Sequence, residues 1–460
     1  MSFDAIVIGS GFGGSVAALR FAEAGLRVLV LERGRRWNKD NLLRRPEDPW
    51  LWSHESPERD NGWLDLRLFP HMAVAQGAAV GGGSHIYANI STEAPPASFV
   101  SGWPPEIDHA GLKPFYDRVA EVMEVQPVPA GQWTERMKLM RDAAVAAGYP
   151  ERFRQLDLAV HFDPDWTYEK DRDKGEAASK PYVNKHGAPQ GSCVHLGTCD
   201  IGCAVAARNT LDLNYLYRAE NLFHVEIRPL HLVDRIEPIG SGWRVQFDRL
   251  DSGERVAGVE DAELVVLAAG SLGSTELLLR NRDVHRTLPA ISPLLGQNWS
   301  SNGDFLTPAL YESREVDANV GPTIASAIDF EDRSFRNQQF WIEDGGIPDL
   351  LLAYLERKAE DPAASFRTRL MIEKLQLFLQ RSDPLSHVMP WFAQGVDAGN
   401  GRLFLTEPGL FSSGGELDLA WNVGDSTPLI ETSSPCTRNC PPRPVVRPSC
   451  RRVGASSDIS

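Results

Sequence analysis

The chain opens with two short apolar segments on either side of a stretch with helical spacing. Residues 3–9 and 27–32 are nearly continuous apolar runs of strand length, and residues 13–25 between them are expected to form a helix. Continuous apolar runs are typical of parallel strands that are buried on both faces. Residues 264–268 repeat this pattern and again lead into small residues and a helix. The pattern predicts an α/β fold built on a parallel sheet.

The remaining segments extend this prediction to a second lobe. Helical spacing recurs in three stretches, which are 108–124, 133–147 and about 207–221. Further short strands are expected at 225–233 and 243–247. Residues 300–430 have alternating segments without a strong helical period, which predicts an antiparallel sheet there.

Composition limits the kind of protein and the kind of partner. The chain has 460 residues, more than one core usually holds, and its 42% hydrophobic and 24% charged residues are typical of a soluble globular protein. The net charge of −15 disfavours nucleic acid or an anionic membrane as a partner. No apolar run approaches the ~20 residues of a spanning helix, and no cleavable leader is visible, so a cytoplasmic location is predicted.

Closely spaced glycines follow the first strand and point to a dinucleotide site. Gly9 permits a tight turn, Gly11 lets the backbone approach a pyrophosphate, and Gly14 lets the helix pack against the strands. The helix N-terminus favours phosphate groups. Glu32 ends the second strand, where its carboxylate can accept hydrogen bonds from ribose hydroxyls and repel a 2′-phosphate.

Two later segments have the same character. Residues 76–91 contain three successive glycines, 81–83, which allow a backbone to lie flat against a planar ring. The turn at Gly270, which follows the apolar run 264–268, brings another stretch of backbone close to a cofactor.

These segments and one cysteine-containing segment resemble the glucose-methanol-choline (GMC) flavin oxidoreductases, most closely the cholesterol-oxidase-like branch. The resemblance covers residues 1 to about 305 and, more loosely, 385–430. The segments that carry it are Gly9–Gly14 with Glu32, Val80–Asn89, Cys193–Leu216 and Leu267–Leu278 with Leu295–Asp304.

The resemblance implies a non-covalently bound FAD and oxidation of an alcohol CH–OH to C=O, with electrons passing to oxygen or another acceptor. It implies that glycines hold the pyrophosphate, that Glu32 holds the adenosine ribose, and that the backbone of Val233 contacts the adenine. The cofactor-binding residues that it implies are Gly9, Gly11, Phe12, Gly13, Gly14, Glu32, Gly82, Gly83, Ser84, Tyr87, Ala88, Asn89, Val233, Ala269 and Gly270.

The expected architecture is a Rossmann-like FAD-binding domain with an α+β substrate domain on an antiparallel sheet. The FAD-binding domain is expected to be discontinuous, comprising 1–95 and 190–305, and the substrate region to comprise 96–189 and 306–431. Residues 432–460 are rich in Ser, Pro, Arg and Cys, lack apolar periodicity, and are predicted to be disordered.

The catalytic end of the family pattern is not found. The family supplies a base from a C-terminal segment resembling His-Pro-x-Gly, followed later by Asn-Pro, and no histidine follows His387 here. His387 itself is interpreted as structural, and Gly424-Asp425-Ser426 as part of an earlier family segment. The catalytic residues therefore stay unknown, and the chain is predicted to be truncated, to retain FAD weakly and to turn over little.

Three cysteines, Cys193, Cys199 and Cys203, leave an alternative function open. They could ligate an iron–sulfur cluster and make the protein an electron-transferring dehydrogenase, or bind zinc if His195 joined them. The favoured interpretation is that they are small packing thiols and that no metal is bound. The tail cysteines Cys436, Cys440 and Cys450 are interpreted as incidental.

The substrate is predicted only as a class. Aromatic residues in the second lobe would suit a bulky apolar alcohol such as a sterol, although they would serve equally well in a core; they are Trp103, Phe115, Phe340 and Trp341. Glu312 and Glu343 could act in a steroid isomerisation, an interpretation weakened because glutamates are commonly exposed. A catalytically inactive flavin-binding fragment is the remaining alternative.

Overall fold

A four-stranded parallel sheet forms the centre of one half of the protein. The computed structural model describes residues 3–100, 102–251, 253–311, 313–350, 353, 385–407 and 415–438. The strand order is β10-β2-β1-β14, from β1 (Ala5–Ile8), β2 (Val28–Leu31), β10 (Glu226–Arg228) and β14 (Leu264–Leu267). Every neighbouring pair is parallel, and every residue of β1 and β2 is buried, as their continuous apolar sequence predicts.

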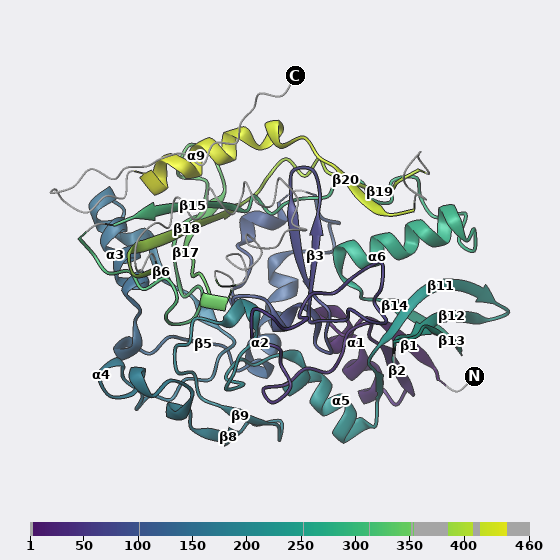
Figure 1. The fold of residues 1–460 in the computed structure, drawn as a ribbon. Helices are drawn as coiled ribbons and strands as arrows, with labels where there is room; N and C mark the ends of the chain where they lie inside the picture. The colour runs from purple at the N-terminus through teal and green to yellow at the C-terminus, as the bar shows by residue number, and fades with distance from the viewer. Residues whose placement is uncertain are drawn as a thin grey trace.

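Different elements cover the two faces of this sheet. Helices α1 (Phe12–Glu23) and α5 (Tyr215–Phe223) pack on one face through a cluster that includes Val7, Val30 and Leu19. The other face packs on a three-stranded antiparallel sheet, made of β11 (His231–Ile239), β12 (Gly242–Arg249) and β13 (Val256–Ala262), and on α6 (Gly270–Leu279) (Figure 1).

A five-stranded antiparallel sheet forms the other half. Its order is β15-β18-β17-β16-β6, from β15 (Phe305–Leu310), β18 (Val388–Gly395), β17 (Phe340–Asp344), β16 (Ser326–Phe330) and β6 (Phe153–Gln155). Helices α3 (Glu135–Ala147) and α9 (Thr427–Arg438) cover one of its faces (Figure 1). Thr134 caps α3, because its hydroxyl accepts a hydrogen bond from the N–H of Met137 at 3.1 Å.

In the described part of the chain, two further helices and four strand pairs lie outside these sheets. The helices are α2 (His109–Val122) and α4 (Tyr168–Asp171). The strands pair as β3 (Leu64–Leu68) with β4 (Ala73–Gly77), β5 (Gln126–Pro127) with β7 (Asp157–Leu158), β8 (Pro181–Val183) with β9 (Pro189–Gly191), and β19 (Arg402–Leu405) with β20 (Leu417–Ala420). The α/β prediction and the predicted antiparallel sheet are confirmed.

Two sequence predictions of element boundaries are wrong. The helix expected from about 207 begins at Tyr215, because Asn214 is its N-cap and accepts a hydrogen bond from the N–H of Tyr215 at 2.6 Å. The side-chain amides of Asn209 and Asn214 donate to backbone carbonyls, at 2.7 and 3.0 Å, and hold the preceding residues outside the helix. The strand expected over 225–233 is two strands in two sheets. The chain turns at Leu230, which has φ +58° and donates its N–H to the carbonyl of Gly34.

The predicted disorder of 432–460 is also wrong at its start. Helix α9 continues through Arg438, so the helical backbone extends beyond the end of the family-like sequence at Glu431. Residues 439–460, with Cys440 and Cys450, lie outside the described residues.

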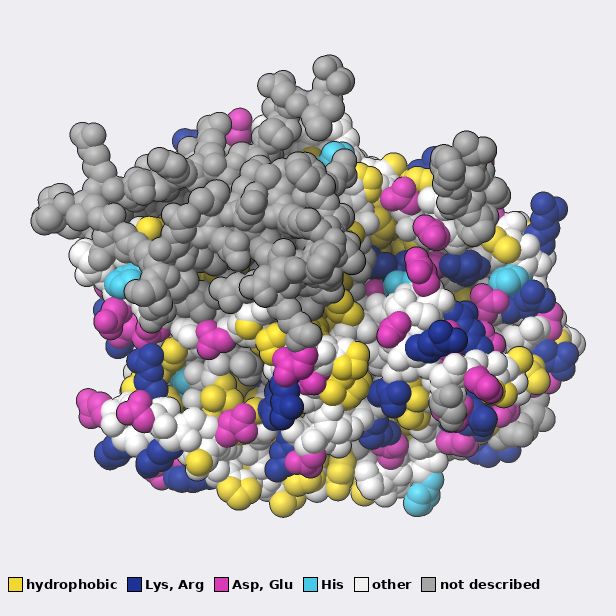
Figure 2. Space-filling view, viewed as in Figure 1, with side chains coloured by type: hydrophobic (Ala, Val, Ile, Leu, Met, Phe, Trp, Pro, Cys, Tyr) yellow, Lys and Arg dark blue, Asp and Glu magenta, His cyan; other side chains and the backbone are white. Residues whose placement is uncertain are grey.

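Two surface features bear on possible partners. Acidic and basic side chains are interspersed over the described part of the face in Figure 2, so the net charge of −15 is not gathered into one patch there. Among the described residues, no helix combines the length and the apolar character that a membrane crossing requires.

Candidate cofactor site

The first glycine turn lies where β1 ends, and its conformation leaves little choice of residue. Gly9 has φ +94°, and a Cβ added to it would lie 2.5 Å from the carbonyl oxygen of Ala268 at the end of the neighbouring strand β14. A Cβ on Gly14 would overlap the carbonyl oxygen of Gly9. These two glycines are therefore required by the packing of the turn on the sheet.

The second glycine segment packs directly on the first. Gly82 has φ +53°, and a Cβ on it would lie 2.7 Å from the Cα of Gly11. In contrast, a Cβ on Gly11 would meet nothing closer than the Cα of Gly82, at 3.9 Å. The protein itself therefore does not require glycine at position 11, which leaves bare backbone available to a ligand at the N-terminus of α1.

Glu32 is held at the end of β2 by its neighbours. Its Oε2 accepts hydrogen bonds from the N–H and the hydroxyl of Ser10, at 3.0 and 2.7 Å, and its Oε1 accepts one from the N–H of Gly34 at 2.9 Å. The side chain is buried, with 4% exposed. Oε1 keeps a second acceptor position, which suits a ribose hydroxyl.

Ser10 also joins the two glycine segments. Its hydroxyl oxygen accepts a hydrogen bond from the N–H of Gly81 at 3.0 Å. The same hydroxyl lies between Glu32 and the second segment, so a single buried serine connects the ribose-binding candidate to the glycine cradle. The sequence analysis did not single out Ser10.

The third turn and Val233 complete the same edge of the sheet. Ala268 donates its N–H to the carbonyl of Ile8 at 2.8 Å, and Gly270, with φ +77°, opens α6 next to Ala269. The strand that carries Val233 begins beside Glu32, since His231 donates its N–H to the Glu32 carbonyl at 2.8 Å. The structure thus brings the predicted glycine turns, Glu32 and the Val233 strand to one edge.

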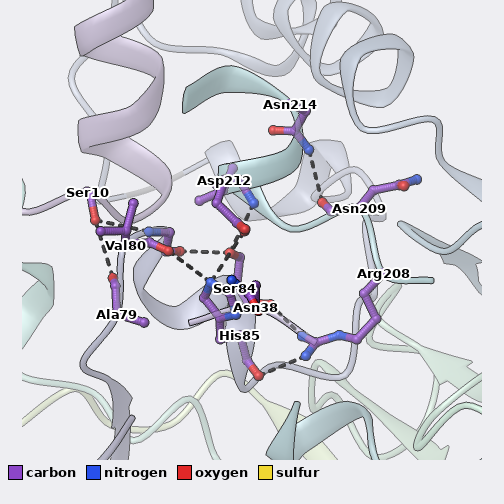
Figure 3. A network of polar contacts seen from close by, with 12 residues as sticks. Ser10, Asn38, Ala79, Val80, Ser84, His85, Arg208, Asn209, Asp212 and Asn214 are labelled. Atoms are coloured by element: carbon purple, nitrogen blue, oxygen red, sulfur yellow. Dashed lines mark hydrogen bonds and ion pairs between the residues drawn. The ribbon is translucent and has the colours of Figure 1, made fainter. Parts of the chain in front are cut away.

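A buried arginine fixes the loop that follows the second glycine segment. Arg208 donates from Nη1 to the carbonyl of His85 at 2.8 Å, from Nη2 to the carbonyls of Tyr87 (3.0 Å) and Ser84, and from Nε to Oδ1 of Asn89 at 2.7 Å. Arg208 approaches this loop from the side opposite Ser10 (Figure 3). Four acceptors on one guanidinium hold residues 84–89 in a single conformation.

Asn89 keeps one polar atom free inside this loop. Its backbone has φ +69°, its side chain is fully buried, and its Nδ2 has no hydrogen-bond partner among the described residues. Because a buried N–H group without a partner is costly, this amide is suited to donate to a ligand. Ala88, beside it, packs against the core that leads to the five-stranded sheet.

Aromatic and ionic contacts shape the rest of the loop. The rings of Phe12 and Tyr87 meet edge to face with centroids 5.2 Å apart, and burial raises the pKa of Tyr87 to about 12. Gly83 lies next to the Phe12 ring. Burial acts to raise the pKa of Asp212, but the charge and hydrogen bond of His85, 3.3 Å away, hold it below its usual value.

The cysteine segment does not form a metal site. Among the described residues, no group of three or more His, Cys, Asp and Glu side chains is arranged to hold a metal ion. Burial raises the pKa of Cys193 and of Cys199. Neither the iron–sulfur alternative nor the zinc alternative gains support here.

His195 is occupied by other groups. Its Nδ1 accepts from the hydroxyl of Tyr168 at 2.8 Å, its Nε2 lies 3.2 Å from Oε1 of Gln132, and Trp166 stacks on the ring. Burial lowers the pKa of His195 to about 3, so the ring is neutral. The network orders the core beneath the five-stranded sheet.

The aromatic substrate candidates separate into different environments. Phe340 is 1% exposed and belongs to the core under α3, whereas Trp103 and Phe115 are 52% and 59% exposed. Trp341 lies on the opposite face of the five-stranded sheet from Phe340. His387 contacts the carbonyls of Tyr311 and Arg314 through Nδ1, at 3.0 Å each, as a structural residue would. Glu312 lies outside the described residues.

Comparison with known proteins identifies this arrangement. Residues 4–39 match the family model of an FAD-binding domain. The cholesterol oxidase of Acinetobacter baumannii is 30% identical over 340 residues, which cover 71% of this chain and 59% of that protein. The cholesterol oxidase of Mycobacterium tuberculosis H37Rv is 33% identical over 337 residues, 71% of this chain and 56% of that protein. An uncharacterised GMC-type oxidoreductase of the same strain is 30% identical over 152 residues, 32% of this chain and 23% of that protein.

This chain is similar to cholesterol oxidases and, over a shorter stretch, to a GMC-type oxidoreductase. Its similarity lies on the cholesterol-oxidase branch, and FAD, the predicted cofactor, is confirmed by the match to an FAD-binding domain. The chain spans less than two thirds of the length of these cholesterol oxidases. In the crystal structure of pyridoxine 4-oxidase from Mesorbium loti, the same fold is found at 14% identity, with a TM-score of 0.54 over 95% of this chain and 80% of that chain.

The residues of this chain fit FAD. The open backbone at Gly11 and the free amide of Asn89 are features that the protein alone does not explain. Sequence reasoning missed Arg208, which the structure places at the centre of the site. The residues next to Arg208 do not mark it as functional, because it lies in an Arg-Asn-Thr segment of a long polar stretch. Only the folded chain brings it beneath the loop at 84–89.

Proposed function

We propose that this chain is an FAD-dependent oxidoreductase that acts on the CH–OH group of a bulky alcohol of the sterol type. The observation that supports it most strongly is the convergence of three glycine-containing turns on one edge of the parallel sheet, at Gly9–Gly14, Gly81–Gly83 and Gly270. The relatives named cholesterol oxidase indicate the substrate class.

In this proposal a bound FAD would supply the hydride acceptor for the carbinol carbon, and the residues of the chain would bind and orient the FAD. Gly9, Gly11 and Gly14 line the pyrophosphate, and Glu32 accepts from the adenosine ribose. Residues 82–89 lie along the flavin, where Arg208 keeps their backbone rigid and Asn89 donates its free N–H. A rigid loop orients a planar ring without an entropic cost at the time of reaction.

We further propose a division of labour along the chain. Residues 1–95 and 190–305 form the cofactor domain, and 96–189 with 306–431 form the substrate side. Strand β6 supports this division, since residues 153–155 pair with β16 in the five-stranded sheet.

No residue of this chain is identified as the acceptor of the hydroxyl proton. No histidine follows His387 in the 460 residues, and His387 itself is bound to backbone carbonyls. We therefore propose that this chain alone turns alcohols over slowly, with oxygen or another electron acceptor reoxidising the flavin.

The test is flavin reduction under anaerobic conditions. The purified protein is loaded with FAD and mixed with cholesterol in detergent or with a long-chain primary alcohol, and the flavin absorbance is followed. We expect FAD to bind and the alcohol to bleach it slowly. Rapid bleaching would refute the predicted impairment, and a protein that takes up no FAD would refute the proposed function itself.

A further inference from the structure

A cavity of about 480 Å³ lies between the chain that joins β2 to β3 and the turn that follows β10. Its volume is within the ~300–1,000 Å³ of small-molecule sites. Three arginines line it, which are Arg35, Arg36 and Arg59, and no Asp or Glu is among its described lining residues. None of the predicted cofactor residues lines it either, so it is a separate feature of the molecule.

Two of the three arginines have no carboxylate partner. Arg35 donates from Nε to Oδ1 of Asn61 at 2.5 Å, which orients its guanidinium, and no contact of its Nη atoms is found in the described part of the chain. The side chain of Arg59 makes no hydrogen bond or ion pair with any described residue. Arg36 pairs with Glu220 at 2.6 Å. In a chain of net charge −15, this cavity is thus a local attraction for anions.

The acidic residues next to Arg59 in the sequence have other partners. Glu58 pairs with Arg255 at 2.8 Å, and Asp60 accepts from the hydroxyl of Ser56 at 2.9 Å. The positive charge of Arg59 is therefore left for the cavity and the solvent around it.

Trp37 adds a neutral donor to the same cavity wall. It is 6% exposed, and its indole N–H has no hydrogen-bond partner among the described residues. Trp63, in the same apolar cluster, instead donates its indole N–H to the carbonyl of Leu43 at 3.0 Å. A buried N–H without a partner is costly, so a ligand oxygen that accepts from Trp37 would account for it.

The remaining wall of the cavity is largely apolar. Leu43, Pro49, Pro229 and Leu230 line it together with the arginines. A phosphate or carboxylate alone would leave most of this volume to water, whereas an apolar ring would remove these side chains from water. The donors and the apolar wall together favour one ligand with an anionic part and an apolar part.

We propose that this cavity binds a phosphate monoester of an apolar ring system, separately from FAD. Arg35 and Arg59 hold the phosphate, Trp37 donates to one of its oxygens, and the ring lies on Leu43 and the two prolines. A phosphate suits these donors better than a carboxylate, because it has three terminal oxygens and a charge of about −2 at neutral pH. The inference does not depend on the proposed function, since it uses none of the cofactor residues.

Calorimetric titration tests the class of ligand. The probe is 1-naphthyl phosphate, and the comparison compounds are inorganic phosphate, 1-naphthol and 1-naphthoate, each of which lacks the ring, the charge or the phosphate. Excess FAD is present throughout, so that the glycine-lined edge is filled. We expect the probe to bind at one site per chain, at least about tenfold more tightly than each comparison compound. Equal or tighter binding of any of these, or no binding of the probe, would overturn the inference.

Arg59→Gln is the sharpest test of the site, because this side chain has no hydrogen bonds to lose. We expect an unchanged thermal midpoint and about tenfold weaker binding of 1-naphthyl phosphate. Arg45→Gln is the control, since Arg45 is an exposed arginine of the same segment that does not line the cavity. Equal weakening by the two substitutions would show only a general effect of charge and would refute the site.

A third substitution should strengthen binding, which a misfolded protein cannot do. Glu220→Gln removes the carboxylate that pairs with Arg36, so 1-naphthyl phosphate should bind about threefold more tightly. Unchanged or weaker binding would contradict the role of the arginines as partners of the phosphate.

Discussion

The glycine-lined edge of the parallel sheet and the inner face of the five-stranded sheet solve different binding problems. At the glycine-lined edge, backbone and a few hydrogen-bonded side chains make the site, with Glu32 held by Ser10 and Gly34. At the five-stranded sheet, side chains make the surface, and within the described part of the chain neither carboxyl oxygen of Glu343 has a hydrogen-bond partner. The first arrangement suits a constant ligand, and the second allows substrates to change by substitution of single residues.

The two regions should also respond differently to substitution, in stability and in ligand binding. A substitution at the glycine edge disturbs packing and cofactor binding together, because the same backbone serves both. Replacing Glu343 by an apolar residue is expected to raise stability, because it removes a buried carboxyl that has no partner among the described residues. The experiments below are arranged to break this contrast, from the largest expected effect to the smallest.

Gly14→Ala should have the largest effect. Its Cβ would overlap the carbonyl oxygen of Gly9 and lie 3.2 Å from the Cβ of Ala268, so we expect a loss of about 3 kcal/mol in the free energy of unfolding and no FAD binding. Gly131→Ala is the control, because nothing lies within 4 Å of its added Cβ. Urea denaturation of both variants measures the difference. Equal stabilities would show that the turn is not packed as described.

Arg208→Met should follow. It leaves the carbonyls of Ser84, His85 and Tyr87 and the amide of Asn89 without their donor, which is expected to cost about 3 kcal/mol in unfolding free energy and to weaken FAD binding. Hydrogen exchange should be faster at 84–89. Arg249→Met changes a half-exposed arginine and is the control. Unchanged exchange at the loop would contradict the clamp.

The carboxyl of Asp65, on β3, predicts how the stability of the protein depends on pH. Burial acts to raise its pKa, but the hydrogen bond of His54 and the charges of Arg33 and Arg67 outweigh it and hold the pKa at about 2, below the usual 3.8. A depressed carboxyl pKa adds stability above pH 3.8 that is lost as the pH falls toward 2.

Asp65→Asn should therefore lose about 2 kcal/mol at neutral pH and show a flatter decline of stability in acid. The exposed Asp40→Asn is the control. Parallel acid-denaturation curves for Asp65→Asn and the unmodified protein would contradict the assignment.

Glu32→Gln should have the smallest of these effects. It keeps the shape of the side chain but weakens its bonds to Ser10 and Gly34 and its acceptance of ribose hydroxyls, so we expect FAD to bind about tenfold more weakly, or roughly 1.4 kcal/mol. Titration of FAD followed by flavin fluorescence measures it. An unchanged affinity would remove Glu32 from the site.

Much of the cofactor half could be predicted from sequence, since its elements are local. The apolar runs of β1 and β2, the turn at Gly9–Gly14 and the acid at Glu32 lie within one supersecondary unit whose spacing is fixed by packing. Arg208 could not be found this way. Its contacts to 84–89 span more than a hundred residues of sequence and exist only after folding.

The substrate half was predicted as a class and not in detail. The alternating residues predicted an antiparallel sheet. The face toward which Glu343 points depends on the register of β17 with β16 and β18, and the alternation along one strand does not predict that register. Likewise, the helix begins later than its spacing predicts. The hydrogen bonds that the side chains of Asn209 and Asn214 make to backbone carbonyls cannot be inferred from helical spacing.

The central claim is that bare backbone at Gly11 receives the cofactor, and one measurement tests it most directly. A Cβ at Gly11 meets nothing in the protein closer than 3.9 Å, so Gly11→Ala should leave the thermal midpoint without FAD unchanged. Calorimetric titration should show one FAD bound per chain in the unmodified protein and an affinity about a hundredfold lower in Gly11→Ala. FAD binding of equal strength to both proteins, or to neither, would contradict the account.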